Sequence, residues 1–318
     1  MLEIGIPIYK SRKTLPKALD SLVAQTKNNF IVCLSIDGDN ENYNDIIKEY
    51  QHRGLKIRII NSKENGGPGV ARQRVLDTTQ CDYIMFLDSD DMLLPRAVSI
   101  LYTQAKLGNY DIVRSSFIRE EKNQQDLYLP QNVNTITWFH GKIYKVKYLK
   151  DNNICFLPDL RADEDAYFNL IAWNSTKQRG ELSEITYLWR FNENSITRAN
   201  KTKEYFIKTH MYYIRSQTEG LKKLAELNPT MNGKLIAQTL INIYMYYMHA
   251  RYYQLPEGPM NESISSLKTL PWMQKFLLQP GNWVEIINNL KAGDIYDKSI
   301  IVFFTEPFNQ WAARLLKV

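Results

Sequence analysis

Residues 83–91, Tyr83-Ile84-Met85-Phe86-Leu87-Asp88-Ser89-Asp90-Asp91, place three carboxylates directly after a run of apolar side chains. The apolar run predicts a buried strand, with the carboxylates at its carboxyl end. Like charges so close together repel one another, so their gathering indicates a bound cation. Oxygen ligands of this kind suit Mg²⁺ or Mn²⁺, with a diphosphate completing the coordination shell. The alternative is a solvated turn in front of the helix expected from residue 95.

Around this stretch, the sequence alternates between the periodicities of strands and of helices. Short apolar segments alternate with amphipathic segments, a pattern typical of parallel strands joined by helices. We therefore expect an α/β fold with a doubly wound sheet, which binds its ligands at the carboxyl ends of the strands. The expected strands are 2–9, 30–37, 56–61 and 82–88, and the expected helices are 14–25, 43–52, 67–79 and 95–107.

The pattern changes twice in the rest of the chain. The middle of the chain is mixed, with strands expected over 136–144 and 185–191 and a helix over 163–173. Helical periodicity then takes over, with helices expected at 205–227, 233–253 and 261–278. We therefore predict two domains, residues 1–200 with the sheet and residues 201–318 with helices.

Two further groups of polar residues follow expected strands. Asp37, before Gly38, closes the second strand, where a carboxylate can accept hydrogen bonds from a nucleobase imide or a ribose hydroxyl. The run Asn65-Gly66-Gly67-Pro68-Gly69 follows the third strand, and its glycines let the backbone approach a ligand. Arg72, in the first turn of the next helix, can reach a phosphate or a base. An ordinary turn is the alternative at Asp37, and the glycine spacing matches neither a dinucleotide fingerprint nor a P-loop.

A third acidic group, Asp163-Glu164-Asp165, begins an expected helix. Negative charge at a helix N-terminus is stabilised by the helix dipole, so a simple cap is one interpretation. The other interpretation is a general base. A carboxylate here could take the proton of an attacking hydroxyl while a cation neutralises a departing diphosphate.

Taken in order, six short motifs resemble those of family-2 glycosyltransferases with the GT-A fold. They are Ile4-Gly5-Ile6-Pro7-Ile8-Tyr9, Asp37-Gly38, Asn65-Gly66-Gly67 with Ala71-Arg72, Asp88-Ser89-Asp90-Asp91, Glu164-Asp165 and Ser195-Ile196-Thr197-Arg198. Any one of them is weak, but six in order are specific, and they cover about residues 1–200. The resemblance implies a GT-A doubly wound mixed sheet and an inverting, metal-dependent transfer of a sugar from a nucleotide-sugar donor.

The resemblance also implies roles for individual side chains. Asp165 would be the catalytic base, with Glu164 beside it, and Asp90 with Asp88 would coordinate Mn²⁺ or Mg²⁺. The implied donor-binding residues are Pro7, Tyr9, Asp37, Gly67, Arg72, Asp88, Ser89 and Arg198. The segment 138–144 resembles the acceptor-side segment of the family, and its implied acceptor-binding residues are Trp138, His140, Gly141 and Lys142.

Several substrates are compatible with this resemblance. The donor would be a UDP-sugar or another nucleoside-diphosphate sugar, and the first expectation for the acceptor is a cell-envelope glycan or a polyol-phosphate polymer. Most of the net charge of +6 falls after residue 198, which favours an anionic partner and leaves a hydroxymethylated DNA base as an alternative acceptor. A nucleotidyltransferase is the alternative of another class. It would need a glycine-rich basic loop after the first strand, and Tyr9-Lys10-Ser11-Arg12 contains no glycine.

Composition also bears on location and assembly. No run of about 18 apolar residues could span a membrane, no signal peptide is visible, and the three cysteines are scattered. We therefore expect a cytoplasmic protein, including the inner face of the membrane, where the amphipathic segment 308–318 could make a peripheral contact. The aromatic segment 243–253 is expected to be a core helix, a homo-oligomer interface or an acceptor platform. Residues 201–318 would accordingly serve acceptor binding or oligomerisation.

Overall fold

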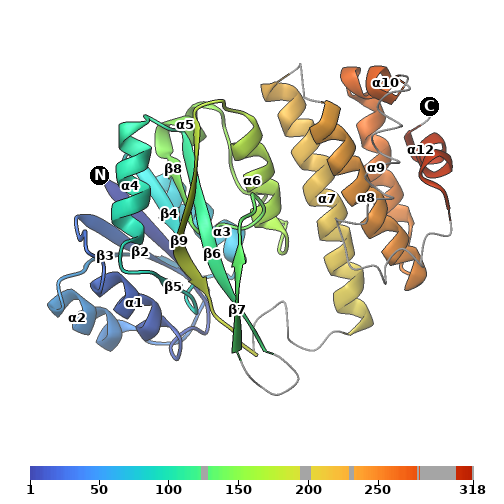
Figure 1. Cartoon of the computed structure of the whole chain (residues 1–318). Coiled ribbons are helices and arrows are strands. Elements are labelled where there is room, and N and C mark those ends of the chain that lie inside the picture. Colours follow the sequence, from blue (N-terminus) through green and yellow to red (C-terminus); the bar gives the residue numbers. More distant parts are fainter. Residues whose placement is uncertain (123–127, 194–201, 229–232, 278, 280–305, 317–318) are drawn as a thin grey trace. The chain divides into compact units, whose positions relative to one another are not determined.

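The computed structural model describes residues 1–122, 128–193, 202–228, 233–277, 279 and 306–316. The chain divides into two compact units, Met1–Ala199 and Asn200–Val318. The first unit is a sheet with helices on both faces, and the described part of the second unit is built from helices (Figure 1).

A mixed sheet organises the first unit and has nine strands among the described residues. Its strands follow the order β3-β2-β1-β4-β8-β6-β9-β5, with β7 paired to β6. Neighbours from β3 to β4 are parallel, whereas β8 is antiparallel to both β4 and β6. The strands are β1 (Leu2–Ile8), β2 (Phe30–Asp37), β3 (Lys56–Ser62), β4 (Tyr83–Phe86), β5 (Met92–Leu93), β6 (Ile112–Lys122), β7 (Tyr128–Val133), β8 (Lys142–Lys145) and β9 (Arg179–Trp189).

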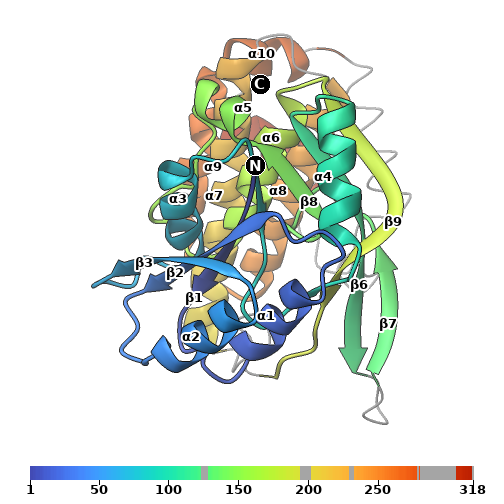
Figure 2. The same cartoon turned by 90° about the vertical axis from the view of Figure 1, so that its left-hand side faces the viewer.

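Six helices of the first unit cover the two faces of this sheet. Figures 1 and 2 show α1, α2 and α4 on one side of the sheet and α3, α5 and α6 on the other. Their bounds are α1 (Leu15–Val23), α2 (Asn44–His52), α3 (Pro68–Thr78), α4 (Ala97–Leu107), α5 (Val146–Asp151) and α6 (Glu164–Asn174). Both faces of the sheet are therefore covered by helices.

Each face of the sheet has its own apolar layer, because successive side chains of a strand point to opposite faces. Ile4 and Ile6 of β1 are fully buried in one layer, together with Leu19 of α1 and Leu101 of α4. The layer on the other face is aromatic, and its rings belong to Phe86, Phe139, Tyr144, Phe156 and Phe168. Close packing on both faces fixes where the strands end, and so where the polar side chains after them lie.

The expected α/β class and the doubly wound mixed sheet are confirmed. One expected strand is wrong over most of its length, since only Lys142–Lys145 of the segment 136–144 forms a strand. The residues before it bend and turn, and Gly141 has a positive φ of 63° that strands avoid. Strands β5, β6 and β7 were not expected. β5 has two residues and is too short to carry a periodic signal.

The second unit packs its helices around a separate apolar core. Its elements are α7 (Lys203–Leu227), α8 (Gly233–Tyr252), α9 (Gly258–Ser265), a 3₁₀-helix (Ser266–Thr269), α10 (Pro271–Leu277) and α12 (Phe308–Leu316). The single helix expected over 261–278 is wrong. Pro271 lacks the amide proton that would continue the preceding turn and instead begins α10. Of the helices that the structure describes, none has the length and apolarity needed to cross a lipid bilayer.

Candidate active site

Three parallel strands deliver the candidate site residues to one edge of the sheet. In the register, Gly5 of β1 pairs with Phe86 of β4, and Ile8 of β1 pairs with Ile36 of β2. Tyr9, Asp37 and the Asp88–Asp91 turn therefore follow neighbouring strand ends. This is the edge at which open α/β sheets bind their ligands.

The carboxylate of Asp37 is turned inward to the glycine-rich loop. Its side chain is 2% exposed, and its two oxygens accept hydrogen bonds from the amides of Gly66 (3.0 Å) and Gly67 (2.7 Å). Arg74 adds an ion pair at 2.6 Å, a contact that the sequence reasoning missed. A side chain at Gly38 would lie 2.3 Å from the Asn65 amide nitrogen, so the loop requires a glycine there. Asp37 thus shapes the loop that could approach a donor.

Arg72 joins the two acidic motifs across the site. Its guanidinium is buried and donates to Asp88 at 2.5 Å and to Glu164 at 2.7 Å. It also lies over the ring of Phe139, 4.8 Å from the centroid. At Gly69 an added Cβ would lie 3.1 Å from Glu164 Cγ, so α3 and α6 approach closely where the bridge forms. Arg72, expected to reach a donor, instead directs both terminal nitrogens to carboxylates.

The Asp88–Asp91 turn is held in place by the end of β9. The Tyr187 hydroxyl donates to Asp91 Oδ2 at 2.6 Å and accepts the Asp88 amide at 3.3 Å. The Arg190 amide donates to Asp91 Oδ1 at 2.9 Å, and Asn192 Nδ2 donates to Asp90 Oδ2 at 2.7 Å. Tyr187 was not identified from the sequence, since nothing local links it to residues 88–91. Asp91 is consequently an internal anchor of the turn.

Ser89, expected at the donor, ties this turn to the loop after β1. Its hydroxyl lies 2.7 Å from the hydroxyl of Ser11, so two of the strand-end loops are hydrogen-bonded to each other. Ser11 is also held by the residue in front of α2, because its amide donates to the Tyr43 hydroxyl at 3.0 Å. The donor-side loops therefore form one connected layer.

A group of three side chains could hold a metal ion. Ligand atoms of Asp88, Asp91 and His140 all lie within 4.8 Å of one another. His140 Nε2 faces the two carboxylates at 3.9 Å and 3.8 Å, while its Nδ1 is buried with no hydrogen-bond partner among the described residues. Burial lowers the pKa of His140, which keeps the imidazole neutral, the form that binds metals. The two carboxylates of this donor set are ligands that suit Mn²⁺ or Mg²⁺, and the imidazole adds a nitrogen ligand.

The sequence placed Asp90, not Asp91, beside Asp88 at the metal. Asp91 is 1% exposed and both of its oxygens already accept hydrogen bonds, whereas Asp90 is half-buried at the rim. Burial and the charge of Asp88 raise the pKa of Asp90 above its usual value. A cation would relieve that repulsion. Asp88 is a candidate ligand both in the sequence prediction and in the observed group with His140. Of the two possible second carboxylates, Asp90 is more accessible than Asp91.

The protonation of Asp88 is set by its neighbours. Burial alone would raise the pKa of this carboxyl, but Arg72 and His140 hold it below its usual range. Asp88 is thus an anion at physiological pH, as a metal ligand must be.

At the start of α6, the two candidate catalytic carboxylates have different surroundings. Glu164 is 7% exposed and paired with Arg72, whereas Asp165 is half-buried and accepts a hydrogen bond from the Ala166 amide at 2.8 Å. Burial and the charge of Glu164 raise the pKa of Asp165 to about 7. Asp163 occupies the N-cap position with a left-handed φ of 62°. Asp165 is thus the carboxylate whose proton affinity suits a general base near neutral pH.

Of the four acceptor-side residues, three are buried, including His140 with 5% exposure. Gly141 and Lys142 are buried: a Cβ at Gly141 would lie 2.6 Å from Ser115 Oγ, and Lys142 is 1% exposed. Trp138 is only partly buried, with its ring centroid 5.2 Å from that of Trp189 and 6.1 Å from that of His140. Trp138 is therefore the member of this group that could touch an acceptor, and Trp189 is an aromatic neighbour that the sequence reasoning missed.

The nucleobase end of the expected donor site is open to solvent. Tyr9 is 46% exposed and Pro7 half-buried, and the Lys10 ammonium lies 5.2 Å from the centre of the Tyr9 ring. Lys10 has a positive φ of 50°, and its amide donates to Asp39 at 2.5 Å. This bond holds the turn that presents Tyr9. Arg198, expected over the diphosphate, lies outside the described residues.

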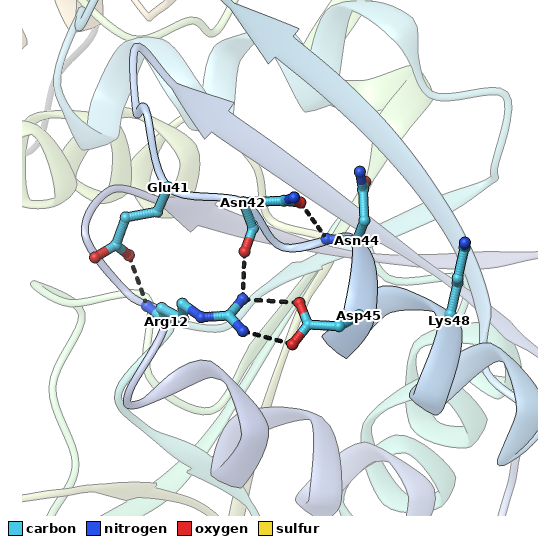
Figure 3. A pocket seen from close by; sticks show the side chains of 6 residues that line it. All are labelled: Arg12, Glu41, Asn42, Asn44, Asp45 and Lys48. Carbon is cyan, nitrogen blue, oxygen red and sulfur yellow. Dashed lines mark hydrogen bonds and ion pairs between the residues drawn. The ribbon is translucent and has the colours of Figure 1, made fainter.

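A shallow hollow beside this loop does not contain the expected site residues. Figure 3 shows that Arg12 fills its centre, paired with Asp45 by hydrogen bonds of 2.8 Å and 2.5 Å. The lining residues are Arg12, Glu41, Asn42, Asn44, Asp45 and Lys48. Because the guanidinium is already paired, we do not place the donor there.

Comparison with known proteins assigns the chain to a family. A model of the family described as Glycosyl transferase family 2 matches residues 3–161. The glycosyltransferase EpsJ of Bacillus subtilis is 26% identical over 217 residues, covering 62% of this chain and 63% of EpsJ. The poly(ribitol-phosphate) beta-glucosyltransferase of Bacillus spizizenii is 29% identical over 204 residues, covering 59% of this chain and 32% of that enzyme. These matches thus take in less than two thirds of each relative.

Solved structures of low identity share the fold. TarS 1–349 of S. aureus in complex with UDP-GlcNAc superposes with a TM-score of 0.56 at 19% identity, covering 93% of each chain. The mannosyltransferase PcManGT of Pyrobaculum calidifontis, in complex with GDP-Man and Mn²⁺, gives 0.52 at 11% identity, covering 93% of this chain and 87% of that one. With the family model matching half of the sequence and the strand-end motifs in place, the chain belongs to glycosyl transferase family 2.

Proposed function

We propose that this family-2 glycosyltransferase transfers a sugar, with inversion, from a nucleoside-diphosphate sugar to a hydroxyl of a polymeric acceptor. The observation that carries the proposal is the Arg72 bridge between Asp88 and Glu164. It ties the turn with the candidate cation ligands to the start of α6, where the neighbouring Asp165 has a raised pKa. The match to the glycosyltransferase family argues against the alternative that the protein is a nucleotidyltransferase.

A divalent cation fits the residues at this edge. Asp88, Asp90 and His140 would hold Mn²⁺ or Mg²⁺, which would neutralise the charge of the departing diphosphate. Hydrogen bonds from Tyr187 and Arg190 fix Asp91, and a hydrogen bond from Asn192 fixes Asp90. The glycine-rich loop, whose Gly66 and Gly67 amides donate to Asp37, has little side-chain bulk and supports close approach of the sugar nucleotide.

Asp165 is the proposed base. Inversion requires the acceptor oxygen to attack the anomeric carbon from the side opposite the diphosphate and to lose its proton as the bond forms. A carboxylate with a pKa of about 7 can accept that proton at neutral pH. Glu164 cannot easily serve, because its ion pair with Arg72 would have to break first.

The proposed substrates follow the relatives. Two matched relatives are named as poly(ribitol-phosphate) transferases, and solved neighbours hold UDP, UDP-GlcNAc or GDP-Man with Mn²⁺. For this chain we propose a UDP-sugar donor and a polyol-phosphate polymer as acceptor. The partly exposed Trp138, with Trp189 next to it, supports the assignment, because an aromatic ring can stack on a sugar or polyol.

Calorimetry and a turnover assay test the proposal. UDP and GDP are titrated into the protein with and without Mn²⁺, and UDP release is then followed from UDP-glucose and UDP-GlcNAc with poly(ribitol phosphate). We expect metal-dependent binding of UDP and faster release with the polymer than without it. Absence of binding for both nucleotides would refute the function, whereas binding without polymer-stimulated release would refute only the acceptor.

A further inference from the structure

We propose that Asn169 is a positioning residue that fixes residues 135–138, which lead into the acceptor-side segment 138–144, to the helix that carries Asp165. The inference rests on the proposed function, since it concerns how the acceptor is placed against the base. Asn169 belongs to none of the motifs that identified the site. It lies in the middle of α6 and is 0% exposed.

The side-chain amide of Asn169 makes one bond in each direction. Its Nδ2 donates to the main-chain carbonyl of Thr137 at 2.9 Å, and its Oδ1 accepts from the Tyr144 hydroxyl at 2.6 Å. A carbonyl oxygen can only accept, so the amide nitrogen must face Thr137 and the oxygen is left for Tyr144. Tyr144 is itself 0% exposed in the aromatic layer, so its hydroxyl sets the orientation of the amide.

A second buried side chain holds the same segment. The Lys142 ammonium donates to the carbonyl of Thr135 at 2.9 Å and to the carbonyl of Trp138. With Asn169 on Thr137, three carbonyls of this four-residue segment bind buried side chains. The segment lies outside any helix or strand, so these bonds replace the regular backbone hydrogen bonds that it lacks.

Asn169 lies on the same helix as the proposed base, so its hydrogen bond to Thr137 also connects the segment to Asp165. Asn169 follows Asp165 by four residues, which places the two side chains on the same face of the helix, one turn apart. The base and the anchor of the segment are thus carried by one rigid element. The segment ends at Trp138, the candidate acceptor contact, and continues into His140, whose Nε2 faces Asp88 and Asp91.

The chemistry of the link explains why an amide is used in an apolar layer. A buried amide is costly unless every bond is made, but when satisfied it fixes one geometry more strictly than apolar packing does. Acceptor attack needs the hydroxyl within about an ångström of its place relative to the base. Asn169 therefore contributes to acceptor placement, while donor binding at the strand ends does not depend on it.

Isosteric variants test the inference. Asn169→Asp keeps the shape of the side chain, but the ionised carboxylate cannot donate to the Thr137 carbonyl. Tyr144→Phe keeps the ring but removes the hydroxyl that donates to Asn169 Oδ1. The matched control is Asn174→Asp in the last turn of α6, where the amide bonds only to the helix carbonyl of Leu170. We expect Asn169→Asp to lower kcat/KM for poly(ribitol phosphate) by about 10- to 100-fold, in line with small misplacements of reacting groups. Tyr144→Phe should show a smaller loss.

Comparing donor affinity with acceptor kinetics distinguishes a positioning role from a general loss of structure. The affinity for UDP with Mn²⁺ should stay within about twofold of the wild type in both variants, whereas a merely structural role would weaken donor and acceptor steps together. Equal losses in both, or wild-type acceptor kinetics in both variants, would overturn the proposal. If Asn169→Asp does not fold, Tyr144→Phe alone decides between these outcomes.

A spectroscopic readout keeps the inference independent of the proposed function. In protein labelled with 5-fluorotryptophan, the ¹⁹F resonance of Trp138 should shift or broaden in Asn169→Asp, and that of Trp311 in the second unit should not. If the wild type fails to transfer to the polymer, the proposed function fails on that result. An unchanged Trp138 resonance would instead overturn the positioning role.

Discussion

Two acidic groups of this chain are alike in sequence and different in structure. The Asp88–Asp91 turn and the start of α6 each gather three carboxylates within three or four positions. In the turn, every carboxylate has a separate partner: Asp88 has Arg72, Asp90 has Asn192, and Asp91 has Tyr187.

The start of α6 distributes its charge in another way. Glu164 forms an ion pair with Arg72. Burial and the negative charge of the neighbouring Glu164 raise the pKa of Asp165. The pKa of Asp88 is meanwhile lowered by Arg72 and His140, against the effect of burial. The partner of each carboxylate, and not the density of acidic residues, therefore decides which one stays ionised and which one can exchange a proton.

Removing the shared cation should break this comparison most severely. Arg72→Met leaves Asp88 and Glu164 without their buried partner, and loss of one side of a buried ion pair costs about 3–5 kcal/mol. We expect the free energy of unfolding to fall by that amount in chemical denaturation, with loss of transferase activity. Arg53→Met, which removes an exposed pair with Asp20, is the control and should leave the free energy of unfolding nearly unchanged. A similar small change for both variants would contradict the bridging role of Arg72.

Changing the base sharpens the comparison within α6. Asp165→Asn keeps the size of the side chain but cannot accept the proton, and loss of a positioned base typically costs about 10²–10⁴-fold in rate. We expect kcat to fall in that range while calorimetry shows unchanged affinity for UDP with Mn²⁺. Glu164→Gln is the partner experiment. If it abolishes turnover with the fold intact while Asp165→Asn remains active, Glu164 is the base.

The metal site separates the residues of the turn. We expect Asp90→Ala to abolish measurable metal-dependent UDP binding, because the accessible carboxylate is lost from a site that bridges a diphosphate. His140→Ala should weaken that binding by about 10- to 100-fold, as changes around a metal usually do. Calorimetry with UDP and Mn²⁺ measures both variants. If Asp90→Ala binds as the wild type does and His140→Ala does not, the ion lies between Asp88, Asp91 and His140.

Local pattern predicted most of the catalytic fold, because each early element repeats its own signal. The alternation of apolar strands with amphipathic helices is directly readable in β1 to α4, and the strand-end rule then located Asp37 and Asp88. The same logic failed where the backbone overrides the pattern. The segment 136–144 alternates like a strand, but only its last residues form β8, and Pro271 divides an apparently continuous helix.

The contacts that tune the site were out of reach of local pattern. Arg72 and Glu164 are separated by 92 residues, and Tyr187 and Asp91 by 96, so no motif brings them together. The sequence identified Lys142 and Gly141 as acceptor residues by resemblance, but only the tertiary structure shows that both are buried. Residue type and order were therefore enough for the edge of the site, and long-range packing was needed to learn which way each side chain faces.

The pH dependence of turnover is the finest test of the difference between the two acidic groups. Asp165 has a raised pKa of about 7 and must be deprotonated to act as a base. With saturating donor and Mn²⁺, kcat should therefore increase about tenfold per pH unit on the acid side and level off once the carboxylate is ionised. The midpoint should lie at or below pH 7, because a cation bound nearby favours the ionised form.

Asp88 should not contribute to this acid limb, since its pKa is held low and it stays ionised throughout the range. Replacing Asp165 by Asn should accordingly leave a small rate without this acid limb, because the proposed base no longer titrates. Affinity for UDP with Mn²⁺, measured over the same range, should change less than kcat does. If kcat of the wild type is flat and the midpoint appears in UDP affinity instead, the titrating group belongs to the metal site. The group that titrates would then lie in the Asp88–Asp91 turn and not at the start of α6.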